Sequence, residues 1–189
     1  MAEPYCLVAR GHPVHGPFHD AEHGFPVHSD AALLERLALE INQAGLSWLV
    51  ALRRREGLAR AFAGYDLDAV AAYGEPEVRR LLADPGVIRH RRKIEAVIEN
   101  ARRMVALRER HGSARAWFDL HHPLPPEGWL KLLRRQFVFV GPEIVNELLL
   151  GIGYLPGAHI PECPIRPKVI AANPPWLHAA RQGVVGGEG

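Results

Sequence analysis

The sequence has few cysteines and no long apolar segment. Its two cysteines, Cys6 and Cys163, stand near opposite ends, so they do not form the disulfide framework of a small secreted protein. No apolar run approaches the length of a transmembrane helix, and the first residues lack the apolar core of a signal peptide. We therefore expect a cytoplasmic protein with no membrane partner.

Strand patterns and nucleotide-binding loops are also scarce. The only short candidate strand, residues 137–140, lies between two helical segments and is better explained as a tight connector. Neither GxxxxGK[ST] nor GxGxxG occurs. From residue 31 onward apolar residues recur at helical spacing, as in Leu33, Leu34, Leu37 and Ile41. The sequence thus predicts an all-α protein.

The composition is that of a single globular domain. The chain has 189 residues, of which 48% are hydrophobic, and a formal net charge of +2, which is compatible with a polyanionic partner without identifying one. Prolines and a terminal Gly-Val-Val-Gly-Gly-Glu-Gly dominate the last residues. We expect one domain over residues 1–165, in two helical lobes, and a flexible tail over 166–189.

Cysteine and histidine occur together at both ends of the chain. Cys6 and His19 lie near the N-terminus, and His159 and Cys163 have a His-x3-Cys spacing near the C-terminus. Thiolate and imidazole suit tetrahedral zinc, and four protein ligands would make such a zinc structural. The alternative is simple burial, because the first 29 residues hold five histidines and chance spacings are easy: His12, His15, His19, His23 and His28.

A break between two helices brings polar and aromatic side chains together. Gly45 ends the first helix and Ser47 can cap the next. Glu40 and Trp48 flank the break, and a carboxylate beside an indole suits a flat, hydrogen-bonding ring such as a nucleobase. The alternative is an ordinary helix corner in which Leu46 and Trp48 belong to the core.

Two other stretches could contact phosphate. Gly141 precedes a helix that begins at Pro142, so backbone N–H groups are free there, and Arg134 lies just upstream. The basic stretch 89–93, which ends in Lys93, is either a phosphate-binding patch or a solvated helix face. A buried ion pair between Glu40 and this stretch would give Glu40 a purely structural role.

These segments together resemble the 3-methyladenine DNA glycosylase I family. The resemblance covers residues 5–165, in order and in approximate spacing. The motifs that carry it are Phe18-His19-Asp20-Ala21-Glu22-His23-Gly24, Glu40 with Gln43-Ala44-Gly45-Leu46-Ser47-Trp48, Gly86-Val87-Ile88-Arg89-His90-Arg91-Arg92-Lys93-Ile94, Phe137-Val138-Phe139-Val140-Gly141 and His159-x3-Cys163.

The resemblance implies an all-α helix-hairpin-helix DNA glycosylase fold, with a structural zinc tying the N- and C-terminal segments through Cys6, His19, His159 and Cys163. It implies that Glu40 reads the base as the catalytic carboxylate and that Trp48 is an aromatic wall of the base pocket. The residues expected to contact DNA are Gln43, Gly45 and Leu46, at a wedge that fills the gap left by a flipped nucleotide, and Phe139, Gly141, Arg134 and Lys93.

The implied function is hydrolysis of the N-glycosidic bond of 3-methyladenine, or a related cationic alkylpurine, by a monomeric bacterial enzyme without lyase activity that acts on double-stranded DNA. Three pocket positions depart from the family pattern: Phe18 replaces a tyrosine, and His23 and Val8 replace tryptophans. Since stacking contributes about 1–3 kcal/mol per base, two alternatives stay open: a glycosylase of shifted lesion specificity, or a non-catalytic lesion-binding protein.

Overall fold

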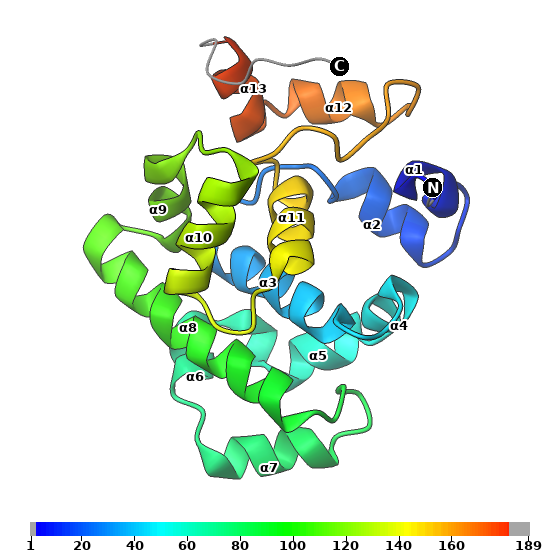
Figure 1. The fold of residues 1–189 in the computed structure, drawn as a ribbon. Coiled ribbons are helices and arrows are strands. Elements are labelled where there is room, and N and C mark those ends of the chain that lie inside the picture. Colours follow the sequence, from blue (N-terminus) through cyan, green and yellow to red (C-terminus); the bar gives the residue numbers. More distant parts are fainter. Residues whose placement is uncertain (1–2, 182–189) are drawn as a thin grey trace.

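The computed structural model describes residues 3–181, with side chains up to residue 178, and consists of helices joined by short loops (Figure 1). This confirms the all-α prediction. No helix in the described range is long and apolar enough to cross a membrane. In chain order the elements are α1 (Tyr5–Ala9), α2 (His15–Ala21), α3 (Asp30–Gln43), α4 (Trp48–Arg53), α5 (Arg55–Ala61), the 3-10 helix η1 (Ala63–Tyr65), α6 (Leu67–Ala71), α7 (Glu75–Ala83), α8 (Arg91–His111), α9 (Ala114–His121), α10 (Pro126–Gln136), α11 (Pro142–Gly151), α12 (Arg166–Ala171) and α13 (Pro175–Arg181).

Helix α3 crosses the middle of the molecule and supplies much of its core. It packs against α4, α8, α9 and α11 (Figure 1). Its first turn is capped by Ser29, whose hydroxyl accepts a hydrogen bond from the Ala32 amide at 3.1 Å. Contact with several helices at once fixes the position of the last turn of α3. Its almost fully buried apolar side chains are Leu33, Leu34, Leu37, Ala38, Leu39 and Ile41.

Helix α8, the longest, connects this core to the hairpin between α10 and α11. Asn100 of α8 is fully buried. Its Nδ2 donates to the Val138 carbonyl oxygen at 3.1 Å, and its Oδ1 accepts from the Val138 amide at 2.8 Å. The backbone of Val138, in the connector of residues 137–141, is therefore satisfied by a side chain instead of by a partner strand, in keeping with the prediction of a tight connector.

The two ends of the chain meet in a second, small apolar cluster. Cys6 of α1 packs there with Cys163, Ile165 and Val169, all of them buried. In Figure 1 the segment leading into α12 lies beside α1 and α2. Residues far apart in the sequence are thus neighbours in space.

The C-terminal segment differs from the flexible tail predicted over 166–189. Residues 166–181 form α12 and α13, each with proline in its first turn, where the missing N–H costs nothing. Val169 of α12 is 3% exposed, and the Trp176 amide donates to the Gly153 carbonyl at 3.1 Å. The many prolines start these helices instead of preventing them. Residues 182–189 lie outside the described residues.

Candidate functional site

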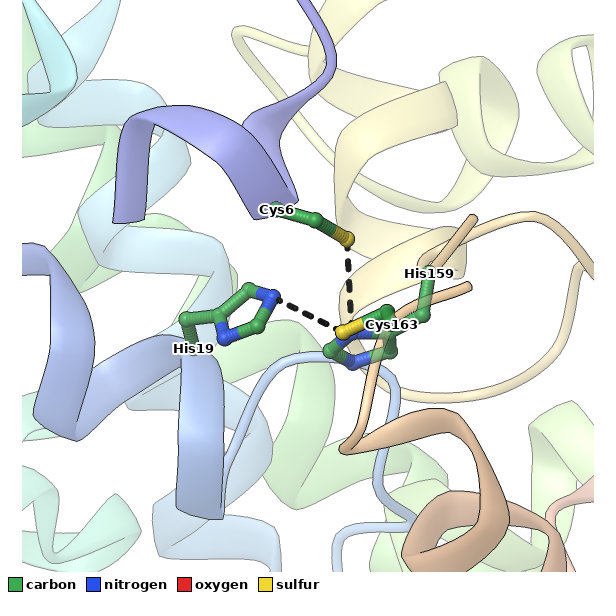
Figure 2. A group of neighbouring side chains, drawn as sticks. All are labelled: Cys6, His19, His159 and Cys163. Atoms are coloured by element: carbon green, nitrogen blue, oxygen red, sulfur yellow. Dashed lines mark hydrogen bonds between the residues drawn. The ribbon is translucent and has the colours of Figure 1, made fainter. Parts of the chain in front are cut away.

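Four cysteine and histidine side chains converge where the chain ends meet (Figure 2). Cys6 comes from α1 and His19 from α2, while His159 and Cys163 come from the loop between α11 and α12. All four are buried, and their potential ligand atoms lie within 4.8 Å of one another. The structure therefore brings together the four residues that the sequence predicted, and the cluster could hold a metal ion.

The distances within this Cys/His cluster fit a tetrahedral metal. Cys163 Sγ lies 3.4 Å from His159 Nδ1 and 3.7 Å from His19 Nε2, and Cys6 Sγ lies 3.6 Å from His159 Nδ1. With metal–ligand bonds of about 2.0–2.3 Å, tetrahedral ligand atoms lie about 3.3–3.8 Å apart. These three pairs of donor atoms therefore already have the spacing that a single central ion needs.

Hydrogen bonds on the far side of each imidazole leave the correct nitrogen free. His19 Nδ1 donates to the Asp20 carboxylate at 2.7 Å, so its Nε2 lone pair faces the cluster. His159 Nε2 donates to the His23 carbonyl oxygen at 2.7 Å, so its Nδ1 lone pair faces the cluster. Such outer partners fix the tautomer of metal-binding histidines in many proteins.

A small cavity of about 140 Å³ adjoins the Cys/His cluster. Two lining residues adjoin members of the cluster: Tyr5 precedes Cys6 in the sequence, and the His23 carbonyl accepts a hydrogen bond from His159. Glu40 and Gln43 enter the cavity from the end of α3 and Trp48 from the start of α4. The whole lining is Tyr5, His23, Glu40, Gln43, Trp48 and Glu147.

Glu40 is the most perturbed carboxylate in this cavity. Burial, reinforced by the negative charge of Glu147, raises its pKa from 4.5 to about 8, and the guanidinium of Arg36 opposes the shift. Within the described residues its side chain makes no hydrogen bond. The ion pair with the stretch 89–93, the structural alternative for Glu40, is not formed among the described residues either. The carboxyl group is therefore held by the fold without a protein partner.

Tyr5 and Glu147 line the cavity although the sequence analysis did not single them out. Trp48 Nε1 donates to the Tyr5 hydroxyl at 3.1 Å, and His15 Nδ1 lies 3.3 Å from the same hydroxyl. Burial raises the pKa of Tyr5 to about 12. No motif marks either residue, because α1 and α11 reach the cavity only through the tertiary fold.

The other predicted pocket residues take different places. Phe18 is 4% exposed and stands behind the cavity, with its ring centroid 5.2 Å from that of Trp48 and the Arg36 guanidinium 4.8 Å from the ring centroid. His23 lines the cavity, and burial lowers its pKa to about 3. Val8 is 41% exposed on α1 and does not belong to the lining.

The turn after α3 projects its apolar side chain outward. Gly45 has φ of +75°, a conformation in which other residues are strained. Leu46 is 44% exposed, so the alternative that placed it in the core is wrong, while Trp48 is half-buried. Gln43 connects this turn to the cavity.

The position of Lys93 differs from the DNA-contacting position that the sequence predicted. It is 5% exposed, and its Nζ donates to the carbonyl oxygens of Asn42 and Ala44 at 2.8 and 2.5 Å. The ammonium group thus satisfies carbonyls at the C-terminus of α3, where a positive charge is favoured. Lys93 supports the turn from inside and does not face solvent as a phosphate ligand.

The hairpin between α10 and α11 is open at its tip. Phe139 is half-buried and has φ of +60°. Gly141 caps α11, and a Cβ added there would meet nothing within 4 Å. Arg134 is exposed on the last turn of α10. The backbone N–H groups at the start of α11 are therefore accessible to an anion.

This helical fold is shared with solved DNA glycosylases. One is the structure described as the basis of 3-methyladenine recognition by 3-methyladenine DNA glycosylase I from Staphylococcus aureus. It superposes with a TM-score of 0.78 at 28% identity, and the match covers 86% of this chain and 96% of that one. The chain therefore has the fold of a DNA glycosylase.

The family follows from the sequence comparisons. The methyladenine glycosylase family model matches residues 8–123, more than half of the chain, so the chain belongs to that family. The DNA-3-methyladenine glycosylase of Haemophilus influenzae is 30% identical over 79% of this chain and 90% of its own length. DNA-3-methyladenine glycosylase 1 of Escherichia coli is 46% identical over 90 residues, and this match spans about half of each protein, 48%.

The raised pKa of Glu40 predicts how stability depends on pH. The folded protein keeps a proton on Glu40 that the unfolded chain releases, so stability falls as pH rises from 4.5 to about 8. Glu40→Gln has no such titration, so across this window it should gain about 4–5 kcal/mol of stability relative to the wild type, at about 1.4 kcal/mol per pKa unit. Urea unfolding at several pH values measures the gain, with the exposed Glu143→Gln as control. Parallel stability curves for the wild type and Glu40→Gln would contradict the assignment.

Proposed function

We propose that this chain excises 3-methyladenine from DNA as a DNA-3-methyladenine glycosylase I. It hydrolyses the N-glycosidic bond of a damaged base that has been flipped out of the duplex, the first step of base-excision repair. The observation that carries the proposal is the carboxyl group of Glu40, which faces a small cavity beside the Trp48 indole without a protein partner. Family membership supplies the substrate class.

The chemistry of the lesion explains why so few catalytic groups are needed. Methylation at N3 puts a positive charge on the base, so the glycosidic bond is already weak and the base leaves as a neutral molecule. Glu40, when ionised, binds the charged ring by electrostatic attraction and hydrogen bonding in a cavity with little water. Trp48 provides a flat apolar surface for the ring, and the Tyr5 hydroxyl holds the indole in place.

The residues around the cavity also favour a monofunctional enzyme. Its lining contains no lysine whose amine could form a Schiff base with the sugar. No aspartate occurs in the sequence from Pro142 to Ile170, after the hairpin. Water is therefore the nucleophile that completes the reaction, and the products are a free base and an abasic site.

Duplex DNA binds at two places, the turn after α3 and the hairpin between α10 and α11. Leu46, exposed at the tip of the turn with Gln43 and Gly45, fills the gap in the base stack left by the flipped nucleotide. The hairpin of Phe139 and Gly141 offers backbone N–H groups to a phosphate, and Arg134 adds positive charge nearby. The protein acts as a monomer on bacterial DNA.

The Cys/His cluster holds one structural zinc. Two thiolates and two imidazoles with the correct free nitrogens match the ligand preference of zinc, and four protein ligands leave no position for substrate. The ion ties α1 and α2 to the loop before α12. It thereby positions Tyr5 and His23, which line the cavity, and joins residues 1–165 into one domain of two lobes.

A glycosylase of shifted lesion specificity is the second candidate. It is favoured by the imidazole of His23 in the cavity, by the lack of a hydroxyl on Phe18, and by the exposed position of Val8. Incubating the protein with methylated DNA and identifying the released bases by mass spectrometry distinguishes the two candidates. Binding to damaged DNA without any released base would instead indicate a non-catalytic lesion-binding protein.

Excision should depend on the ionised form of Glu40. In the free protein this carboxyl group has a pKa of about 8, so single-turnover kcat/KM should rise with pH and level off above that value. Glu40→Gln should remove this pH dependence and lower excision by about 10- to 100-fold, the cost of one preorganised electrostatic contact. Unchanged excision by Glu40→Gln would leave Glu40 with a structural role only.

Phosphate binding at the hairpin between α10 and α11 can be tested with two substitutions of Gly141. Gly141 has φ of −93° and open space at its Cβ, so both Gly141→Ala and Gly141→Asp should fold. Gly141→Asp places a carboxylate against the phosphate and should weaken duplex binding by about 100-fold or more, whereas Gly141→Ala should weaken it far less. Fluorescence anisotropy at fixed salt measures both. Equal affinities for the two variants would exclude a phosphate at this site.

The zinc is tested by metal content and thermal stability. Protein purified without chelators should contain one zinc per chain by elemental analysis. Cys163→Ala should lose the ion, lower the Tm by about 10 °C, and expose both chain ends to protease, because metal binding contributes directly to folding. The exposed His28→Ala, outside the cluster, serves as the control and should keep both metal and Tm. Wild-type protein free of zinc would refute the assignment.

A further inference from the structure

A second carboxylate shares the cavity with Glu40. Glu147 lies in the middle of α11, and α11 packs against α3, the helix that bears Glu40 (Figure 1). Its Oε1 accepts a hydrogen bond from Asn146 Nδ2 at 3.1 Å, and it forms no ion pair with a cation of the described residues. Glu147 is exposed to solvent while its side chain also lines the cavity.

The groups facing Glu40 do not neutralise this charge. Tyr5 from α1 and His23 from the loop after α2 line the same cavity, and neither side chain pairs with Glu147. Arg36, on α3 itself, is held in an ion pair with Glu22 and stands over the Phe18 ring. Within the described part of the chain, Glu147 is thus the one negative charge that another element presents to Glu40.

We propose that Glu147 is a second base-selecting residue, which makes the pocket prefer positively charged purines over neutral ones. This inference rests on the proposed function and extends it. None of the motifs that carry the family resemblance includes position 147. Glu147 selects bases by the charge of the ring, while Trp48 and the cavity walls select them by its shape.

The preference follows from two carboxyl groups that share a small site. Burial, reinforced by repulsion from Glu147, keeps a proton on Glu40 in the empty pocket. A cationic ring relieves the repulsion, so Glu40 gives up its proton when the ring enters. A neutral purine offers no positive charge, so Glu40 keeps its proton and the purine gains no electrostatic attraction from either carboxyl group. Undamaged adenine and guanine are therefore disfavoured even when they are flipped.

The test measures binding of two small molecules in place of DNA, so it does not depend on excision. The probes are 3,9-dimethyladenine, which carries a permanent positive charge, and neutral 9-methyladenine. Glu147→Gln should weaken binding of the cation by about tenfold and leave the neutral probe within about twofold, since only one charge pair is lost. Isothermal titration calorimetry measures both affinities. Glu147→Gln should fold normally because the side chain is exposed.

A matched control and a pH series complete the test. Glu143→Gln removes an exposed carboxylate one turn earlier on the same helix and outside the cavity, and it should bind both probes as the wild type does. The pH at which cation binding reaches half its plateau should be lower in Glu147→Gln than in the wild type, because Glu40 ionises more readily without its neighbour. A purely structural role of Glu147 would not move this midpoint.

The possible outcomes separate this inference from the proposed function. Wild-type affinities and midpoint in Glu147→Gln overturn the inference, as does an equal loss in Glu143→Gln, which would mark a general effect of net charge. Wild-type protein that prefers neither probe overturns it as well. Wild-type protein that selects the cation but releases no 3-methyladenine from methylated DNA contradicts only the proposed function.

Discussion

The burial of α3 on several sides is the constraint on which the rest of the structure depends. Its apolar residues pack against α8, α9 and α11, so the helix has little freedom to shift. Its last turn carries Glu40, and Lys93 satisfies the carbonyl groups beyond that turn. A carboxyl group at the end of a fixed helix can be held in a poorly solvated cavity without a partner, and the energy of core packing offsets the unfavourable placement.

The buried position of Glu40 links the stability of the fold to the proposed function through the proton on its carboxyl group. The folded protein favours the neutral form of Glu40, whereas the proposed recognition of a cationic base by this residue requires the ionised form. In that proposal, the free energy stored in the raised pKa is released only when a positive charge enters. An arrangement of this kind distinguishes charged lesions from the large excess of neutral bases more sharply than shape alone can, because a methyl group by itself adds only about 1 kcal/mol of apolar contact.

The meeting of the two chain ends has a comparable consequence for the pocket. Cys6 and His19 belong to the Cys/His cluster, and the neighbouring residues Tyr5 and His23 line the cavity. A bound metal would therefore fix one wall of the pocket while it stabilises the fold. The hydrogen bond from Trp48 to Tyr5 connects this wall with α4. The departures from the family pattern, Phe18, His23 and Val8, all lie in the N-terminal segment, where only His23 lines the cavity, whereas α3 keeps Glu40.

The sequence by itself determined the helical class, the core face of α3, the exposed turn at Gly45 and the four members of the Cys/His cluster. Helical periodicity, glycine conformation and ligand chemistry are local properties, so they can be recognised without the fold. Only the tertiary structure decided that Lys93 is buried, that residues 166–181 are helical, and that Tyr5 and Glu147 reach the cavity. These facts depend on which helices pack together, and a carboxylate acquires a raised pKa only where distant segments remove its water and place a second negative charge beside it.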